Sequence, residues 1–298
     1  MTSVKISFFL MNEKGYRVLS ALIANNKKVA EVVCSKDKNL VNDYYDNIKI
    51  LCEHNNIKFY DRNDNYADSI TGSYIISIGW RWLIKGKLQD RLIVSHDSLL
   101  PKYRGFAPLV NMLINEEKEI GVSLLFASDN YDCGNIITQK KREVLYPIKI
   151  NKAIETISEL FFEAIMEIYS MIETNNDIPS YVQDESQASY SLWRDEDDYL
   201  IDFTKDAKDI KRFIDAVGEP YLGASAFIGE KKVRFIDVET VSDVTIENRG
   251  VGKVIFVNDN KPIVVCGNGL LKINQLIDDV SRKSILPLSS FRIKFKGK

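Results

Sequence analysis

The stretch Leu92-Ile93-Val94-Ser95-His96-Asp97-Ser98-Leu99-Leu100-Pro101-Lys102-Tyr103-Arg104-Gly105-Phe106-Ala107-Pro108 joins a short apolar run to a turn rich in proline, glycine and charge. The run Leu92-Ile93-Val94 predicts a buried strand. His96, one of only 2 histidines in the 298-residue chain, lies where that strand should end. A histidine in this place suits proton transfer, or it caps the following helix through a local hydrogen bond.

The chain around this stretch alternates strand patterns with helix patterns. Apolar runs at 4–10, 28–34, 57–60, 74–79, 122–127 and 136–144 predict strands, and helical spacing marks 13–25, 39–54, 106–115 and 150–174. This alternation predicts a Rossmann-like α/β domain over residues 1–182, with a mostly parallel sheet and helices on both faces. Asp132 follows a strand, as His96 does, so we expect both side chains at the carboxyl ends of strands.

The remainder of the chain predicts a second, smaller domain. A polar, serine-rich stretch at 183–205 is typical of a linker. The second domain, over 206–298, would begin with a helix at 206–217. Five short β-like runs separated by glycine and asparagine turns then predict a β-barrel-like (OB-like) fold.

Composition excludes several classes of function. The formal net charge of -2 argues against a basic nucleic-acid platform, so we expect no nucleic-acid partner. No apolar run approaches a membrane span and the start has no signal-peptide layout, so we expect a cytoplasmic protein without membrane contact. The 4 cysteines are scattered without metal-ligand spacing, which predicts reduced thiols and no metal site.

Two sequence blocks resemble those of the tetrahydrofolate-dependent formyltransferase superfamily. The first block has the form Asn-x-His-x-Ser-Leu-Leu-Pro-x-x-Arg-Gly, and the chain reproduces it from His96 to Gly105. The second is Asp132-x-Gly134-x-Ile136. One departure stands out, because Val94 occupies the position of the asparagine. The resemblance implies formyl transfer from N10-formyltetrahydrofolate, used as a co-substrate, to an amine.

That reaction assigns roles to His96 and Asp132. When the amine attacks the formyl carbon, a donor must meet the tetrahedral oxyanion and a base must take the amine proton. The resemblance implies that His96 donates to the oxyanion or shuttles the proton, while Asp132 orients His96 or accepts the proton. Asp132 could instead be a turn residue.

Valine at position 94 cannot donate to the oxyanion. Another polar group could substitute, with Ser77, Asn12 and Asn111 as candidates, or His96 could serve alone. A third alternative is an impaired site in a protein that binds folate or sugar.

Two neighbouring segments are candidates for ligand binding. By the resemblance, Arg81, Trp82 and Leu83 would contact the cofactor, with Trp82 and Leu83 forming a wall against the pterin ring. The alternative is that the tryptophans are core. Lys102, Tyr103 and Arg104 would meet substrate phosphates or the folate tail, or would only scaffold their loop.

The acceptor is suggested by the segments at 190–203 and 212–224, which look like those of sugar N-formyltransferases. Methionyl-tRNA formyltransferases share a shorter part of the pattern at 212–224. We therefore expect the acceptor to be a nucleotide-linked amino dideoxysugar used in bacterial surface glycan synthesis, such as O-antigen or lipopolysaccharide, with Met-tRNA as the alternative. A homodimer is compatible with this assignment.

Overall fold

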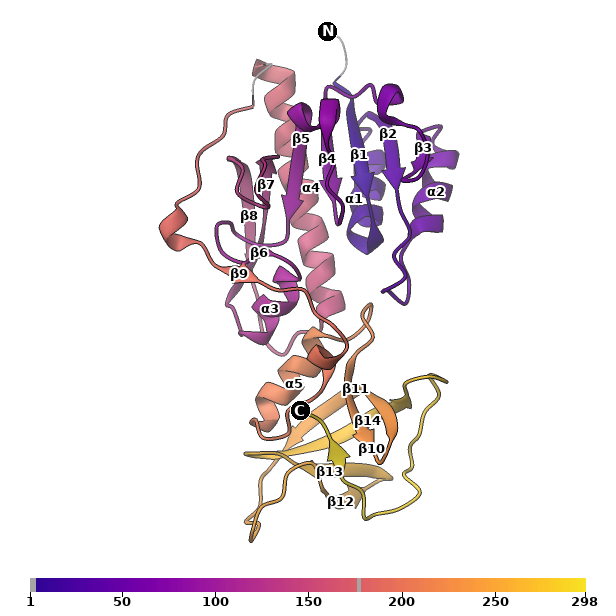
Figure 1. Ribbon diagram of the computed structural model, residues 1–298, viewed down its shortest axis with the longest axis vertical. Helices are drawn as coiled ribbons and strands as arrows, with labels where there is room; N and C mark the ends of the chain where they lie inside the picture. Colours follow the sequence, from indigo (N-terminus) through magenta and orange to yellow (C-terminus); the bar gives the residue numbers. More distant parts are fainter. Residues whose placement is uncertain (1–3, 176–177) are drawn as a thin grey trace. The chain divides into compact units, whose positions relative to one another are not determined.

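The structure, a computed structural model, describes residues 4–175 and 178–298, which divide into two units (Figure 1). The first unit contains the chain up to Leu109, together with Lys118–Val144 and Lys152–Leu192. The second contains Val110–Glu117, Leu145–Asn151 and Trp193–Lys298.

A seven-stranded sheet forms the centre of the first unit, in the order β3-β2-β1-β4-β5-β7-β8. The first five of these strands pair in parallel, and β7 is antiparallel to both of its neighbours. The prediction of a mostly parallel sheet is therefore confirmed. The strands are β1 (Ile6–Leu10), β2 (Val29–Cys34), β3 (Lys58–Asp61), β4 (Tyr74–Ile78), β5 (Leu92–His96), β7 (Glu119–Phe126) and β8 (Ile136–Glu143).

The long helices of this unit lie beside one another. α1 (Asn12–Ala24) contacts α2 (Tyr45–His54), and its Arg17 pairs with Glu155 of α4 (Ile150–Asn175) at 3.0 Å. The opposite face, which carries Phe9, packs against the 3-10 turns η1 (Ala67–Ser69) and η2 (Gly86–Arg91). Helices were predicted on both faces, but within the described ranges this second face shows the short turns η1 and η2, because its connections lack helical apolar spacing.

The antiparallel direction of β7 decides at which end of the sheet the Asp132 loop begins. Ser123 of β7 pairs with His96, and Phe126 pairs with Ile93, so β7 ends toward the amino end of β5. The N–H of Ala127 accordingly donates to the carbonyl of Leu92 at 2.9 Å. The Asp132 loop follows the carboxyl end of β7, as expected, but that end lies beside the amino end of β5 because the two strands are antiparallel. An apolar run predicts a strand but not its direction.

His96 points toward the sheet face that carries Ser77 and Val94. Ser77 is the register partner of Val94 in the parallel pair of β4 and β5, so their side chains share a face. His96 lies two residues beyond Val94 and projects to that same face. The loop between β7 and β8 must return over this face to bring Asp132 to His96.

The second unit contains a curled six-stranded antiparallel sheet in the order β12-β13-β14-β11-β10-β15. Its two edges meet, because the N–H of Val254 donates to Ile293 at 3.0 Å and that of Phe295 donates to Gly252 at 2.7 Å. The barrel-like prediction is confirmed. The strands are β10 (Ala224–Ile228), β11 (Lys231–Val241), β12 (Val254–Asn258), β13 (Lys261–Val265), β14 (Leu270–Asp278) and β15 (Phe295–Lys296).

Shorter elements complete the described chain. The two-residue strands β6 (Arg104–Gly105) and β9 (Tyr190–Ser191) pair in parallel within the first unit. The others are α3 (Pro108–Ile114), η3 (Glu185–Gln187), η4 (Asp197–Tyr199) and α5 (Ala207–Ala216). No helix in the described ranges combines the length and apolarity that crossing a membrane requires.

Three buried phenylalanines fill one part of the barrel interior. The ring of Phe235 lies 5.3 Å from that of Phe295 and 6.1 Å from that of Phe203, measured between centroids, in edge-on geometry. All three side chains are buried. The cluster thus joins β11 to β15, the strand at one edge of the sheet.

Replacing Phe235 with alanine should lower the free energy of unfolding by about 3–5 kcal/mol, because it leaves a cavity between the two other rings. Urea titration followed by circular dichroism measures this loss. Phe256→Ala, at an exposed position on β12, is the matched control and should change stability little. A loss for Phe235→Ala no larger than the control would contradict the assignment of this cluster as core.

Candidate active site

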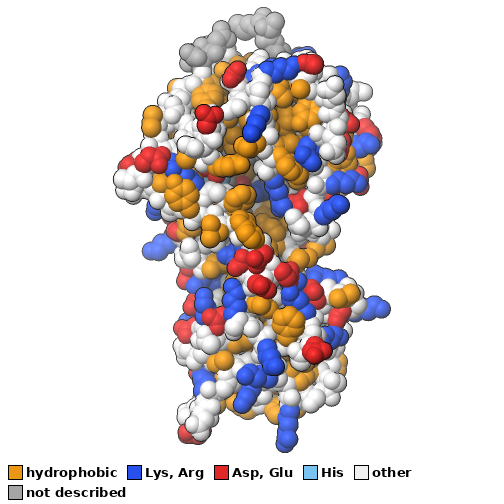
Figure 2. All heavy atoms as spheres, in the orientation of Figure 1, with side chains coloured by type: hydrophobic (Ala, Val, Ile, Leu, Met, Phe, Trp, Pro, Cys, Tyr) orange, Lys and Arg blue, Asp and Glu red, His pale blue; other side chains and the backbone are white. Residues whose placement is uncertain are grey.

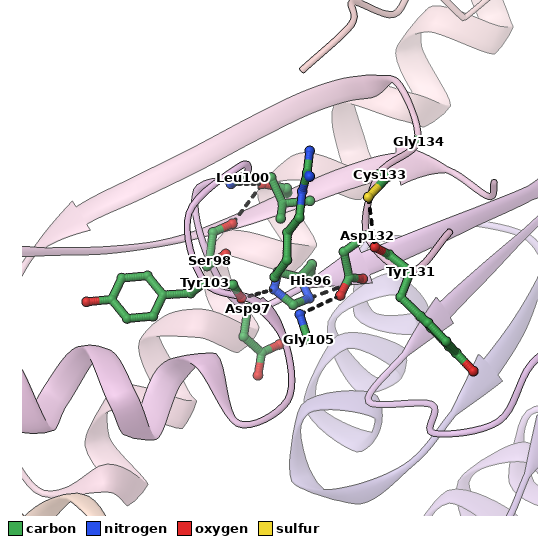
Figure 3. Close-up of polar contacts among 12 residues, drawn as sticks. His96, Asp97, Ser98, Leu100, Tyr103, Gly105, Tyr131, Asp132, Cys133 and Gly134 are labelled. Carbon is green, nitrogen blue, oxygen red and sulfur yellow. Dashed lines mark hydrogen bonds and ion pairs between the residues drawn. The ribbon is translucent and has the colours of Figure 1, made fainter. Parts of the chain in front are cut away.

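His96 and Asp132 meet on the face of the first unit's sheet (Figure 3). The His96 Nδ1 atom lies 3.4 Å from Oδ1 of Asp132. On the other side of the ring, Nε2 lies 2.7 Å from the carbonyl oxygen of Tyr103. The second carboxylate oxygen, Oδ2, accepts a hydrogen bond from the N–H of Gly105 at 2.8 Å. The two predicted catalytic side chains are thus brought together.

The contacts of the His96 ring fix which nitrogen carries a hydrogen. A carbonyl oxygen can only accept, so Nε2 must be protonated to bond with Tyr103. Nδ1 then faces the carboxylate of Asp132, and the two groups can hold one further proton between them. The pair is therefore arranged to take up and release a proton.

Two glycines of the motifs are explained by close backbone approaches. A Cβ on Gly134 would lie 1.8 Å from the carbonyl oxygen of Phe126, so no side chain fits there. Gly105 has φ +99°, and a Cβ there would lie 2.6 Å from the carbonyl oxygen of Ser191. Both approaches bring a loop close enough to support Asp132.

The turn after His96 is held by serine hydroxyls. Ser98 Oγ donates to the carbonyl of Lys102 at 2.6 Å. Ser123 Oγ, on β7, accepts from the N–H of Leu100 at 3.0 Å and donates to the carbonyl of Ser98 at 2.7 Å. The Ser-Leu-Leu-Pro part of the motif therefore forms a fixed turn that returns the chain to Tyr103.

A segment predicted as linker packs against this site. Gln183 Nε2 donates to the carbonyls of Asp132 and Gly134 at 2.7 and 2.8 Å. Its Oε1 accepts from Arg104 Nη2 at 2.7 Å, and Arg104 also pairs with Glu185 at 2.7 Å. Farther along, Arg104 and Gly105 form a ladder with β9. Residues 183–191 therefore belong to the first unit.

The three residues predicted to contact the substrate on the loop after His96 have different environments. Lys102 is exposed, and the ring of Tyr103 points away from His96 (Figure 3). Arg104 is fully buried, and its hydrogen bond with Glu185 raises the pKa of the guanidinium above its usual value. For Arg104 the contacts support the alternative of a loop scaffold, because its charge faces protein groups.

The loop after β4 presents the predicted pterin wall. Trp82 and Leu83 are 37% and 55% exposed, so both are accessible to a ligand. The guanidinium of Arg62 lies 4.2 Å from the centroid of the Trp82 ring, while Arg81 pairs with Asp37 at 2.7 Å. Trp80 is packed into the apolar cluster that also contains Val94, and its Nε1 is buried without a partner in the described residues.

Val94 contacts apolar side chains, including Leu100 and Leu125. Of the three candidates for the missing donor, Ser77 is the register neighbour of Val94 on the His96 face. The Oδ1 atom of Asn12 accepts from the N–H of Lys14 at 3.1 Å. Asn111 belongs to the second unit, where its Oδ1 accepts from Arg194 at 2.7 Å. Ser77 is thus the candidate that lies beside Val94 on the sheet face of His96.

The sequence did not point to Gln183, Glu185 or Ser123. Each acts through a partner far away in the chain, and such partners leave no periodic pattern. No group of three or more His, Cys, Asp or Glu side chains in residues 4–175 and 178–298 is placed to hold a metal ion.

Known proteins are similar to this chain in sequence or in fold. Methionyl-tRNA formyltransferase of Malacoplasma penetrans is 28% identical over 84% of this chain and 81% of its own length. An N-formyltransferase of Helicobacter canadensis, solved with folinic acid and dTDP-3-aminofucose, superposes with a TM-score of 0.65 at 19% identity, over 92% of this chain and 99% of that one.

HypX of Aquifex aeolicus, solved with tetrahydrofolic acid, gives a TM-score of 0.68 at 17% identity over 96% of this chain, which spans only 46% of HypX. Residues 5–167 match the family described as "Formyl transferase", and residues 194–291 match "Formyl transferase, C-terminal domain". With His96 and Asp132 in contact inside the matched region, the chain belongs to the formyl transferase family.

Proposed function

We propose that the protein transfers a formyl group from N10-formyltetrahydrofolate to the amine of a nucleotide-linked amino dideoxysugar. The contact between His96 and Asp132, at 3.4 Å beside the Gly105 N–H, carries the proposal. A formyl transferase must remove a proton from its acceptor amine, and this pair is built to take it.

The chemistry follows from the atoms of the pair. The amine nitrogen attacks the formyl carbon and forms a C–N bond, which leaves an oxyanion on the tetrahedral carbon. The amine proton passes to His96 and Asp132. The bond from carbon to N10 then breaks, and N10 receives the proton, so the products are the formamide and tetrahydrofolate. Because Nε2 of His96 is already bonded to Tyr103, proton transfer is the role that we propose for this ring.

The folate would lie against the loop after β4. Trp82 and Leu83 offer exposed apolar surface for a pterin. The ring of Trp80 lies 5.3 Å from that of Trp82, and its Nε1 is a donor without a partner among residues 4–175 and 178–298. A buried donor without a partner is unfavourable, so a ligand acceptor would stabilise it. We propose that the exposed Lys102 contacts the acceptor, and a contact by Tyr103 stays a prediction.

The charge of the second unit supports a sugar acceptor over tRNA. Residues 193–298 hold 18 Lys and Arg against 17 Asp and Glu. Figure 2 shows acidic side chains interspersed among basic ones on the face that it presents. A tRNA-binding unit would need a basic surface to neutralise phosphates. The binding of dTDP-3-aminofucose by the Helicobacter canadensis protein points to the same acceptor class.

The test of this function is a panel of acceptors incubated with N10-formyltetrahydrofolate. We expect a dTDP-linked 3-amino or 4-amino dideoxysugar to gain the mass of one CO unit, measured by mass spectrometry. Initiator Met-tRNA should gain none. Turnover of Met-tRNA without turnover of any sugar would replace this acceptor with the alternative one.

Replacing His96 with asparagine should lower kcat by at least about 10²-fold, because the amine proton loses its acceptor. Steady-state rates with the reactive sugar measure the change, and circular dichroism checks that the variant is folded. His54→Asn, at the exposed end of α2, is the matched control. A folded His96→Asn enzyme with a near-normal kcat would make His96 a structural residue.

We further propose that Ser77 takes over the oxyanion contact that Val94 cannot make. Ser77→Ala should then lower kcat by about 10²-fold, the usual value of one oxyanion donor, while Val94→Asn should change it only modestly. Both are read from kcat on one acceptor. A large gain in Val94→Asn would show instead that the site is impaired for want of the amide.

A further inference from the structure

We propose that Gln183 is a positioning residue that holds the peptide of Asp132 in the orientation that proton transfer requires. This inference rests on the role proposed above for Asp132. It concerns a residue outside both sequence motifs, in a segment whose composition is that of a linker.

Both the NH₂ group and the oxygen of the Gln183 side-chain amide make hydrogen bonds at this site. Nε2 donates to the carbonyl of Asp132 at 2.7 Å and to that of Gly134 at 2.8 Å. Oε1 accepts from Arg104 Nη2 at 2.7 Å and from Arg104 Nε at 3.2 Å. The side chain is 5% exposed, so water does not compete for these contacts. Both hydrogens and the amide oxygen are therefore committed.

Arg104 fixes the orientation of that amide. A guanidinium only donates, so it must face the Oε1 end, and the NH₂ end must face the two carbonyls. Glu185 holds the guanidinium in turn, through Nη1 at 2.8 Å and Nη2 at 2.7 Å. The contacts run from Glu185 through Arg104 and Gln183 to the backbone of Asp132.

Asp132 needs such support because its backbone is unusual. Its φ of +57° lies in the left-handed region, which few residues other than glycine favour. The loop also begins at the far end of β5 and must return to His96. Without Gln183, the Gly105 N–H and the His96 ring would be the contacts left to position the carboxylate.

The decisive variant is Gln183→Glu, which keeps the side-chain volume and the contact with Arg104. It replaces the NH₂ donor with an oxygen that faces two carbonyl oxygens. A packing role would survive this change and a positioning role would not. We expect kcat with dTDP-3-aminofucose to fall about 10²-fold, as a misplaced group does, with little change in KM for N10-formyltetrahydrofolate.

The pH profile gives a second readout. Protonating the new carboxyl restores one O–H donor toward the carbonyls. The ratio of wild-type kcat to Gln183→Glu kcat should therefore shrink as the pH falls. Gln183→Met, which has no titratable group, should show a similar loss without this recovery. It also keeps the test available if the glutamate variant does not fold.

A spectroscopic readout needs no acceptor. The chain has 2 histidines, so the ring Cε1–H signals of His96 and His54 can be followed by NMR, with His54 as the internal reference. In Gln183→Glu the His96 signal should move, because its carboxylate neighbour moves, and the His54 signal should not. Gln187→Glu, on the exposed part of the same segment, adds the same charge and should move neither signal.

The outcomes separate this inference from the proposed function. An unmoved His96 signal, an unchanged kcat, or equal effects in Gln183→Glu and Gln187→Glu would each overturn the role of Gln183. If the wild-type protein formylates no sugar, the proposed acceptor fails, and the NMR comparison still decides whether Gln183 positions Asp132.

Discussion

The arrangement of the candidate site depends on the buried positive charge of Arg104. The Arg104 side chain is 0% exposed, and a buried guanidinium is costly unless protein groups neutralise it and accept its hydrogens. Glu185 and Gln183 meet this requirement, and they come from a segment some eighty residues later in the chain. The need to satisfy Arg104 therefore draws residues 183–191 against the turn that follows His96. The backbone of Asp132 is held by the same group of contacts.

Elements with a local apolar pattern could be predicted from the sequence, whereas features that depend on distant partners could not. The strands β1, β2 and β4 are short, mostly apolar runs because they are buried on both faces of the sheet. The long helix α4 shows helical apolar spacing because one of its faces packs against the core. The direction of β7 could not be read, since an apolar run is the same in both directions. The start of α2 at Tyr45 was also missed: Asp43 accepts from the N–H groups of Asp37 and Tyr45 and holds the preceding residues in a turn.

The candidate site divides in the same way. His96 and Asp132 were found because their motifs keep fixed local spacing, and they meet in the structure. Gln183 was missed because a glutamine in a polar stretch looks like any solvated residue. Its burial is decided by Arg104, which no local pattern connects to it. The fold is common to relatives that act on tRNA and on sugars, so the acceptor has to be argued from charge and side chains.

The seam that closes the barrel of the second unit has a consequence for its motions. β12 and β15 meet through the pairs Val254–Ile293 and Phe295–Gly252, whereas β11 and β14 pair along nearly their full lengths. Breaking the short seam exposes less surface than separating a long ladder. Local opening of the barrel should therefore occur at this seam. Amide hydrogens at the seam would then exchange with solvent through a local opening, while those between β11 and β14 would wait for the whole unit to unfold. Phe295, which packs against Phe235 in the aromatic cluster, stabilises the closed form of this seam.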